Sequence, residues 1–254
     1  MRPVTPRRPA LLSAAGLAVF LGAWEAAVRG GVLPANFVPA PSAIPQALIG
    51  EIRNGNWFTA IGESLGHYLI GVGLGSLLGI VTGAAVALLP RFAAAQAWVA
   101  RLLRPIPPLA WIPFTLIWFG PSQAAAAFII GVGVFWLNYF ATWSAVEAVD
   151  EGLVELAAAF GQGGFARRLV KVILPAALPG MLSGVRSGLG QGWMAVVAAE
   201  LFGIPGIGQR MNEAAGVLAT NVLVLYMLTI ALLYGMTDLA FERVTRRFLA
   251  WTRA

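Results

Sequence analysis

A short segment of the chain has the spacing of a catalytic nucleophile. Residues 62–66, Gly-Glu-Ser-Leu-Gly, fit the Gly-x-Ser-x-Gly pattern of serine hydrolases, and His67 follows directly. That nucleophile needs a sharp turn between a strand and a helix, whereas this segment opens a long apolar stretch. A histidine beside the serine on one helix also cannot easily reach it as a general base. We therefore interpret the match as chance and not as the site of an intramembrane hydrolase.

The residue types do not indicate a metal site, a reactive thiol or a nucleotide-binding loop. The chain has no cysteine, which excludes disulfides, thiolate metal ligands and a cysteine nucleophile. One histidine and 11 scattered acidic residues leave little from which to build a metal cage. The only lysine is Lys171, and no Gly-x-x-x-x-Gly-Lys-Ser/Thr phosphate-binding loop is present. We expect no metal and no cofactor in this chain, so any energy for work must come from another protein.

The composition indicates a membrane protein. Of the 254 residues, 59% are hydrophobic and only 11% are charged, with a mean hydropathy of +0.78, whereas soluble domains are about one quarter charged. A net charge of +6 could indicate a nucleic-acid partner. Here, however, the charges interrupt apolar runs instead of gathering on a polar face. We therefore predict an all-α, polytopic membrane protein of one domain, residues 1–254, with no nucleic-acid partner.

Six apolar stretches are candidates for membrane spans, since a helix needs about 20 apolar residues to cross a bilayer. We predict spans at about 10–28, 64–89, 105–120, 122–146, 177–202 and 218–242. The third is the least regular, because its prolines interrupt helical hydrogen bonding: Pro105, Pro107, Pro108 and Pro113. The first has the charge order of a cleaved signal peptide, but its apolar run is long for one.

The basic residues predict the orientation of these spans, because loops on the cytoplasmic side are enriched in Lys and Arg. An even number of spans puts both termini on one side. If that side is the cytoplasm, thirteen basic residues lie inside: Arg2, Arg7, Arg8, Arg91, Arg101, Arg104, Arg167, Arg168, Lys171, Arg243, Arg246, Arg247 and Arg253. Only Arg29, Arg53 and Arg210 then lie outside. We predict that both termini are cytoplasmic.

Polar residues inside predicted spans are functional candidates by default, because burying them in lipid is costly. Arg186 and Glu200 share the fifth span but lie too far apart along it to pair directly. Arg186 could attract an anionic substrate, or be a structural or snorkelling residue. Glu200 could bind a gate or cap its helix, while Glu25 and Asp238 are expected to be structural. Further pathway candidates, for which packing or an interfacial belt is the alternative, are Trp136, Asn138, Tyr139, Trp143, Gln191 and Trp193.

Two spans carry glycine at every fourth residue. The positions are Gly71, Gly75, Gly79 and Gly83 in the second span, and Gly180, Gly184, Gly188 and Gly192 in the fifth. Residues four apart share a helix face, and glycine there lets two helix backbones approach closely. We expect these faces to pack against protein, within the chain or in a dimer, with a sliding surface as a compatible further role.

A polar segment, residues 147–175, separates the fourth and fifth spans. It begins with acidic residues and ends with basic ones, an order that suits the dipole of a short helix. Within it, Glu155-Leu-Ala-Ala-Ala-Phe-Gly161 is a good helix former that stops at glycine. A compact helix that protrudes from a membrane domain is a feature to which a soluble partner protein could bind.

This segment, with Val172-Ile-Leu-Pro175, resembles the "EAA" loop of the permeases of binding-protein-dependent ABC transporters. The resemblance covers most of the chain and is closest to the nitrate, sulfonate, taurine and bicarbonate branch. Its other motifs are Val38-Pro-Ala-Pro-Ser42, Arg104-Pro-Ile-Pro107, Ile112-Pro-Phe114, Ile117-Trp-Phe-Gly120, Leu174-Pro-Ala-Ala-Leu-Pro179, Gly184-Val-Arg186, Trp193, Ala198-Ala-Glu200 and Gly206-Ile-Gly208.

The resemblance implies a MetI-like type I importer permease fold with a cytoplasmic coupling helix, in the inner membrane of a bacterium. It implies a second permease copy or paralogue, two cytoplasmic ATPase subunits that bind the ATP and Mg, and an external substrate-binding protein. This chain would then be a non-catalytic pathway subunit in contact with lipid, carrying a small solute for which Arg186 weakly favours an anion. The residues implied in ATPase coupling are Glu151, Glu155, Ala157, Ala158, Ala159, Gly161 and Arg167.

Two positions depart from the branch pattern. The loop reads Glu-Leu-Ala where the family has Glu-Ala-Ala, and His67 stands where the branch usually has an arginine. His67 is therefore a gate candidate whose role differs from the pattern.

The alternative function is a stand-alone, ion-coupled secondary transporter. Such a protein should show inverted repeats and membrane-embedded acidic residues, and its loop would have no partner to hold.

Overall fold

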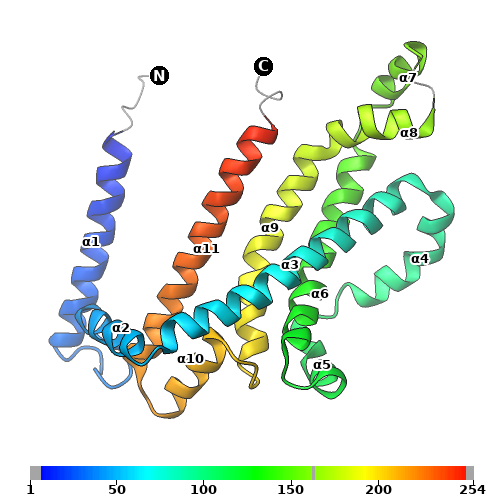
Figure 1. Cartoon of the computed structure of the whole chain (residues 1–254). Helices are drawn as coiled ribbons and strands as arrows, with labels where there is room; N and C mark the ends of the chain where they lie inside the picture. The colour runs from blue at the N-terminus through cyan, green and yellow to red at the C-terminus, as the bar shows by residue number, and fades with distance from the viewer. Residues whose placement is uncertain (1–6, 162–163, 250–254) are drawn as a thin grey trace. The chain divides into compact units, whose positions relative to one another are not determined.

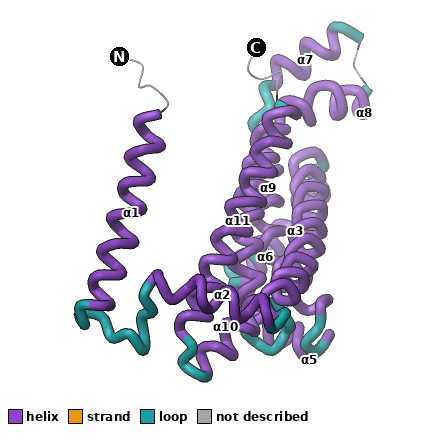
Figure 2. The backbone as a smooth tube through the Cα atoms, turned by 60° about the vertical axis from the view of Figure 1, so that its left-hand side comes forward, coloured by secondary structure: helices purple, strands orange, loops and turns teal. Residues whose placement is uncertain are grey.

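The computed structural model describes residues 7–161 and 164–249. Arg2 and Arg253, which contribute to the predicted charge bias, lie outside these residues. Figure 2 shows the described chain as helices joined by loops, without a strand. In chain order (Figure 1) the elements are α1 Arg7–Arg29, η1 Pro41–Ala43, α2 Ile44–Arg53, α3 Asn56–Leu88, α4 Pro90–Leu103, η2 Pro108–Trp111, α5 Ile112–Phe119, α6 Gln123–Glu147, α7 Glu151–Ala159, α8 Phe165–Arg168, η3 Leu169–Ile173, α9 Leu174–Glu200, α10 Ile207–Gly216 and α11 Thr220–Phe248. The all-α prediction is confirmed.

Five of these segments are long and apolar enough to cross a membrane. They are Leu11–Arg29, Asn56–Leu88, Gln123–Glu147, Phe165–Glu200 and Thr220–Arg247. A sixth passes the same test only as a bent pair of shorter helices. The described chain therefore offers five or six candidate spans, depending on whether this pair counts as one crossing.

The bent pair overlaps the predicted third span and differs most from a simple helix. α4 and the segment Pro108–Phe119 meet at 88° across a short break. The break contains Pro105 and Pro107, and prolines lack the N–H that an unbroken helix needs. Only 108–119 of the predicted 105–120 is helical, so the stretch includes a turn and two short helices.

The chain divides into two units. One consists of residues 61–209 and 230–254, and its core lies where α3, α6 and α9 meet. A Cβ atom built on Gly75 would lie 2.6 Å from the carbonyl oxygen of Gly131 on α6, and one on Gly192 would lie 2.6 Å from Val72 on α3. Gly75 therefore marks a close contact between two helix backbones, and Gly192 makes room for the side chains of Val72 and Tyr68. The predicted packing role of both glycine series within the chain is confirmed.

The other unit consists of residues 1–60 and 210–229. Its loop 30–43 folds back on α1, because Glu25 accepts hydrogen bonds from the Ser42 backbone at 3.1 Å and from its hydroxyl at 2.7 Å. Arg29 also pairs with Glu25. The expected structural role of Glu25 fits these contacts. That the whole chain forms one transmembrane permease domain stays a prediction.

Candidate functional site

α7 is a short helix whose start and stop are both specified by sequence. Asp150 caps its N-terminus by accepting a hydrogen bond from the Gly152 N–H at 2.7 Å. The acidic Glu151 lies in the first turn, where it favours the helix dipole. The helix ends before Gly161, which has a φ of +77°, a conformation that glycine adopts without strain.

α7 packs little against the rest of the chain. None of its residues is buried, and Leu153, Leu156 and Phe160 expose 48%, 55% and 75% of their surface. Figures 1 and 2 both show α7 and α8 beyond the ends of α6 and α9. Of the predicted coupling residues, Ala157 is half-buried and the others are exposed: Glu151, Glu155, Ala158, Ala159, Gly161 and Arg167. The structure therefore places these residues on the exposed segments of α7 and α8, and their role in coupling stays a prediction.

The segment from α8 to α9 links this protrusion to a spanning helix. α8, η3 and α9 follow one another without a loop, and η3 is a π-helical turn. Pro175 lies just after this turn, and its missing N–H removes one α-helical hydrogen bond there. Continuous helical backbone thus joins α8 to α9, with the π-helical turn and Pro175 between them.

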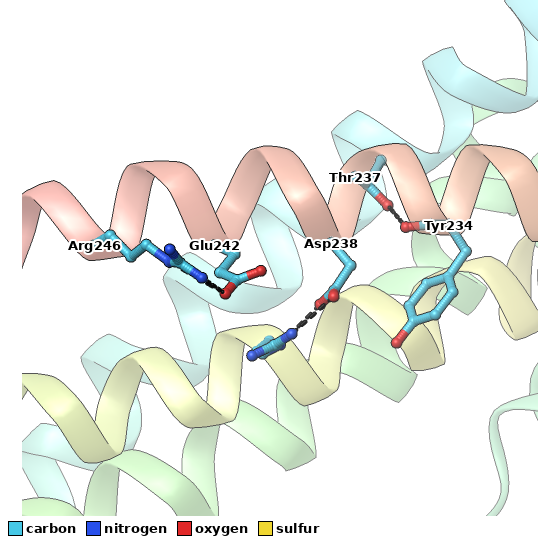
Figure 3. Close-up of polar contacts among 6 residues, drawn as sticks. Tyr234, Thr237, Asp238, Glu242 and Arg246 are labelled. Carbon is cyan, nitrogen blue, oxygen red and sulfur yellow. Dashed lines mark hydrogen bonds and ion pairs between the residues drawn. The ribbon is translucent and has the colours of Figure 1, made fainter. Parts of the chain in front are cut away.

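Arg186 on α9 has a carboxylate partner that its own helix could not supply. Its Nε and Nη2 atoms donate to the two oxygens of Asp238 on α11, each at 2.8 Å. Figure 3 shows Asp238 and Glu242 along α11, with Glu242 hydrogen-bonded to Arg246. A bidentate pair is the strongest arrangement of these two groups. The charge of Arg186 is therefore already balanced, which fits the structural alternative for Arg186 and the expected structural role of Asp238, although the sequence did not identify the two as partners.

Glu200 lies at the centre of a buried polar network. Its Oε2 atom accepts hydrogen bonds from the Ser64 hydroxyl at 2.9 Å and the Gly208 N–H at 2.8 Å. Its Oε1 atom lies 2.9 Å from Nδ1 of His67. The Ile207 N–H in turn donates to the Ser64 oxygen. The network joins α3, the end of α9 and the start of α10.

The same network explains the residues of the hydrolase-like motif. Ser64 is fully buried and already bonded on both sides, and His67, 1% exposed, contacts Glu200 rather than the serine. A Cβ atom on Gly206 would collide with the Glu200 carboxylate, and φ there is +147°. Glycine is thus needed for the loop 201–207 to close around the carboxylate.

The remaining pathway candidates lie among packed helices. Asn138 is fully buried and donates to the Ser76 hydroxyl at 3.3 Å and to the Val134 carbonyl. Trp193 stacks on Tyr68 with ring centroids 4.4 Å apart and donates to Thr237. Three candidates are half-buried, Trp136, Trp143 and Gln191, and Tyr139 is 2% exposed. The structure does not bring these residues and Arg186 together at one site.

One charged cluster was not singled out from the sequence. In the unit of residues 1–60 and 210–229, Arg210 donates to both oxygens of Glu51 at 3.0 Å, and the Tyr226 hydroxyl donates to Glu51 at 2.6 Å. Burial by itself raises the pKa of Glu51, but the hydrogen bonds from Tyr226 and Arg210 outweigh it, so that the pKa lies below its ordinary value. Only the isolated polar stretch Glu51–Asn56 hinted at this site.

Comparison with known proteins decides the family. Residues 71–253 match the family described as binding-protein-dependent transport system inner membrane component. The chain belongs to this family of ABC transporter permeases. The taurine transport system permease protein TauC of Escherichia coli is 30% identical over 96% of this chain and 90% of its own length. The bicarbonate transport system permease protein CmpB of Synechococcus elongatus is 30% identical over 78% and 74%.

The fold of this permease also occurs among solved structures. A chain of the MetNI methionine ABC transporter, in an inward-facing conformation, aligns with a TM-score of 0.64 at 20% identity. The alignment covers 74% of this permease and 94% of that chain. The predicted MetI-like importer fold is therefore confirmed.

Membership of the family settles several further predictions. The permease is a non-catalytic, multi-pass subunit of the inner membrane, for which no cofactor is expected. Family membership likewise implies an ATPase and a binding protein as partners. The two alternatives, a hydrolase and a stand-alone secondary transporter, do not describe this family.

Proposed function

We propose that this permease forms half of the translocation pathway of an importer for a small organic or inorganic anion, and that α7 is its coupling helix. The protruding α7 carries the proposal: it is capped at its start, stopped by glycine and exposed along its apolar side. An exposed apolar surface on a monomer marks an interaction site. The small side chains of Ala157, Ala158 and Ala159 allow α7 to enter a cleft of the ATPase.

The assembly has two permeases, identical or paralogous, above two ATPase subunits, with the binding protein on the outer side and lipid around the spans. Both termini and α7 lie in the cytoplasm, as the distribution of Lys and Arg favours. Because the chain lacks cysteine, an impermeant thiol reagent should label Gly55→Cys in intact cells, but label Ala159→Cys only after permeabilisation. The reverse pattern would contradict this orientation.

An anionic solute is supported by the nature of the relatives. The names of two relatives that are 30% identical give taurine and bicarbonate as their solutes. Taurine carries a sulfonate and bicarbonate is itself an anion, so both solutes present negatively charged oxygens. A sulfonate, nitrate or bicarbonate is therefore the class of solute to test first.

The gate candidates take distinct roles in this proposal. Glu200 and His67 hold the start of α10 against α3 and α9, so a change in that network alters the packing of three elements at once. Arg186 and Asp238 tie α9 to α11. Asn138, Gln191, Trp136 and Trp193 set the shape of the helix contacts around the pathway.

Co-purification with a candidate cytoplasmic ATPase tests the coupling helix. Gly161→Arg places a long charged side chain beside the end of α7, where a Cβ atom meets nothing within 4 Å. We expect the wild-type permease to capture the ATPase stoichiometrically, and the variant to insert in the membrane but lose the ATPase.

Gly55→Arg is the matched control, because Gly55 has a φ of +74° and equally open space. It has the same backbone strain as Gly161→Arg but lies far along the sequence from α7, and it should keep the ATPase. Normal ATPase binding by Gly161→Arg, or equal loss in both variants, would contradict the assignment of α7.

A further inference from the structure

The bend between α4 and α5 adjoins a cavity of about 720 Å³. Figure 1 shows the chain turning here between α4 and α5. Its lining comes mainly from α4, the residues directly after α4, and α6, among them Gln96, Arg101, Arg104, Tyr139, Phe140 and Trp143. The volume lies within the range of about 300–1,000 Å³ typical of small-molecule sites. Irregular backbone within a membrane is tolerated where it is buried in protein or lines a water-filled space.

Two arginines of this cavity lack a balancing charge. Among the described residues that line the cavity none is acidic, and neither Arg101 nor Arg104 forms an ion pair with a described carboxylate. In this they differ from Arg186, whose charge Asp238 balances. Both side chains are exposed, so their charges and N–H donors are accessible to an anion that enters the cavity.

Aromatic rings contact these guanidinium groups and leave N–H donors available for hydrogen bonds. The Arg104 guanidinium carbon lies 4.3 Å from the centre of the Phe140 ring, and that of Arg101 lies 5.4 Å from the Trp98 ring. A cation–π contact uses the face of the guanidinium. Its N–H groups point outward in the plane of the group and remain able to bind a planar or tetrahedral oxyanion.

A buried hydroxyl adds a further donor. Tyr139 is 2% exposed and lines the cavity, and its oxygen has no hydrogen-bond partner at bonding distance among the described residues. The side chain of Gln96, which also lines the cavity, interacts with this hydroxyl, so the cavity wall carries two neighbouring polar groups. Two guanidinium groups, a hydroxyl and aromatic walls together fit an anionic head with a short apolar tail.

We propose that the cavity between α4 and α6 binds the acidic group of a small organic anion, with Arg101 and Arg104 as the residues that select its charge. This inference rests on the proposed function and names the substrate-selecting residues within it. The aromatic rings Phe140 and Trp143 contact the apolar part of the solute. The site lies on the described permease itself, so neither the ATPase nor the binding protein is needed to test it.

The test uses the absence of cysteine in the chain. Ala97→Cys places one thiol in the cavity lining, on the same face of α4 as Arg101 and Arg104. The full chain, in nanodiscs of zwitterionic lipid, is treated with 2-sulfonatoethyl methanethiosulfonate or with its trimethylammonium analogue. We expect the ratio of sulfonate to ammonium labelling rates to exceed that of a free thiol by about tenfold, and ethanesulfonate to slow the labelling.

Arg104→Gln, and independently Arg101→Gln, should lower this rate ratio towards that of a free thiol. Arg91→Gln is the matched control, since Arg91 lies on the same helix but outside the cavity lining, and it should leave the ratio unchanged. Both arginine variants are used so that poor folding of one still leaves a decisive result.

Three results would overturn the proposal. In the first, the thiol of Ala97→Cys does not react in the folded chain but reacts after denaturation. In the second, neither arginine substitution changes the ratio of sulfonate to ammonium labelling rates. Phosphatidylglycerol in the nanodisc could also block labelling where ethanesulfonate does not, which would make the cavity a lipid site. Because these readings need no ATPase, they are independent of whether α7 couples to one.

Discussion

Glu200 shows how a single carboxylate can organise the end of a spanning helix. It is fully buried, and a buried charge is stable only where hydrogen-bond partners replace water. Ser64 and His67 come from α3, far away in sequence, whereas the Gly208 N–H comes from the start of α10, eight residues after Glu200. The carboxylate thus fixes the local arrangement of three helices.

Replacement of Glu200 by alanine should destabilise the permease by about 3 kcal/mol, because it leaves several buried donors unpaired. The measurement is the free energy of unfolding in mixed micelles. Glu147→Ala is the control, since Glu147 is exposed at the end of α6, and its effect should be within about 0.5 kcal/mol. A Glu200→Ala permease as stable as the control would refute the network's structural role.

At the scale of elements, the glycine series decide how closely α3 and α6 approach. Gly71, Gly75 and Gly79 each face a residue of α6 at a separation that leaves no room for a methyl group. Gly73 lies on the same helix with nothing within 4 Å. Packing in a membrane depends on such close contacts, because lipid is as apolar as the side chains.

Gly75→Ala should therefore cost about 2 kcal/mol of stability, since its methyl group must displace the backbone of α6. Gly73→Ala should be neutral or slightly stabilising, because alanine favours the helix. Thermal unfolding of the two variants beside the wild type gives the comparison. If both substitutions shifted the melting temperature alike, the close α3–α6 contact would be wrong.

The Glu51 cluster predicts a pH dependence for α2 and α10. Because the folded-state pKa of Glu51 lies below its ordinary value, the carboxylate stabilises the folded unit at neutral pH. That stability is lost as the pH falls below the ordinary value of about 4.3 and through the lowered pKa. Hydrogen exchange, corrected for its intrinsic pH dependence, should show α2 and α10 opening more at acid pH.

Glu51→Gln provides the control for this pH effect. It removes the titrating group, so α2 and α10 should exchange at one corrected rate from neutral to acid pH. A wild-type permease whose exchange did not depend on pH, or a variant that kept the dependence, would contradict the role of Glu51.

The sequence predicts a helix well where residues within that helix determine its bounds. It predicts less well those bends and pairings that depend on contacts between residues distant in sequence. Asp150, Glu151 and Gly161 specify α7 within the single segment 150–161, and apolar length alone identifies the spans. The prolines at 105–108 warned of an irregular third span, but nothing local specifies a bend of 88°. The pairing of Arg186 with Asp238, 52 residues apart, needs the placement of two helices.

At the scale of the whole molecule, the permease is a non-catalytic subunit, so in our proposal the energy for transport comes from the partner ATPase. Closure of two ATPases around ATP would draw their coupling helices together, and the rigid spans would carry that motion into the membrane. ATP would thereby stabilise one of two packings of the spans, which is a shift of population. This account requires transport to depend on ATP and on α7, and not on an ion gradient.

Uptake of radiolabelled ethanesulfonate into proteoliposomes tests this central claim most directly. The vesicles contain the permease with its candidate ATPase and binding protein, with ATP inside or outside, and an ionophore collapses all ion gradients. We predict uptake that requires ATP on the ATPase side, survives the ionophore and is lost in Gly161→Arg but not in Gly55→Arg. Uptake that continues without ATP and stops with the ionophore would contradict the account.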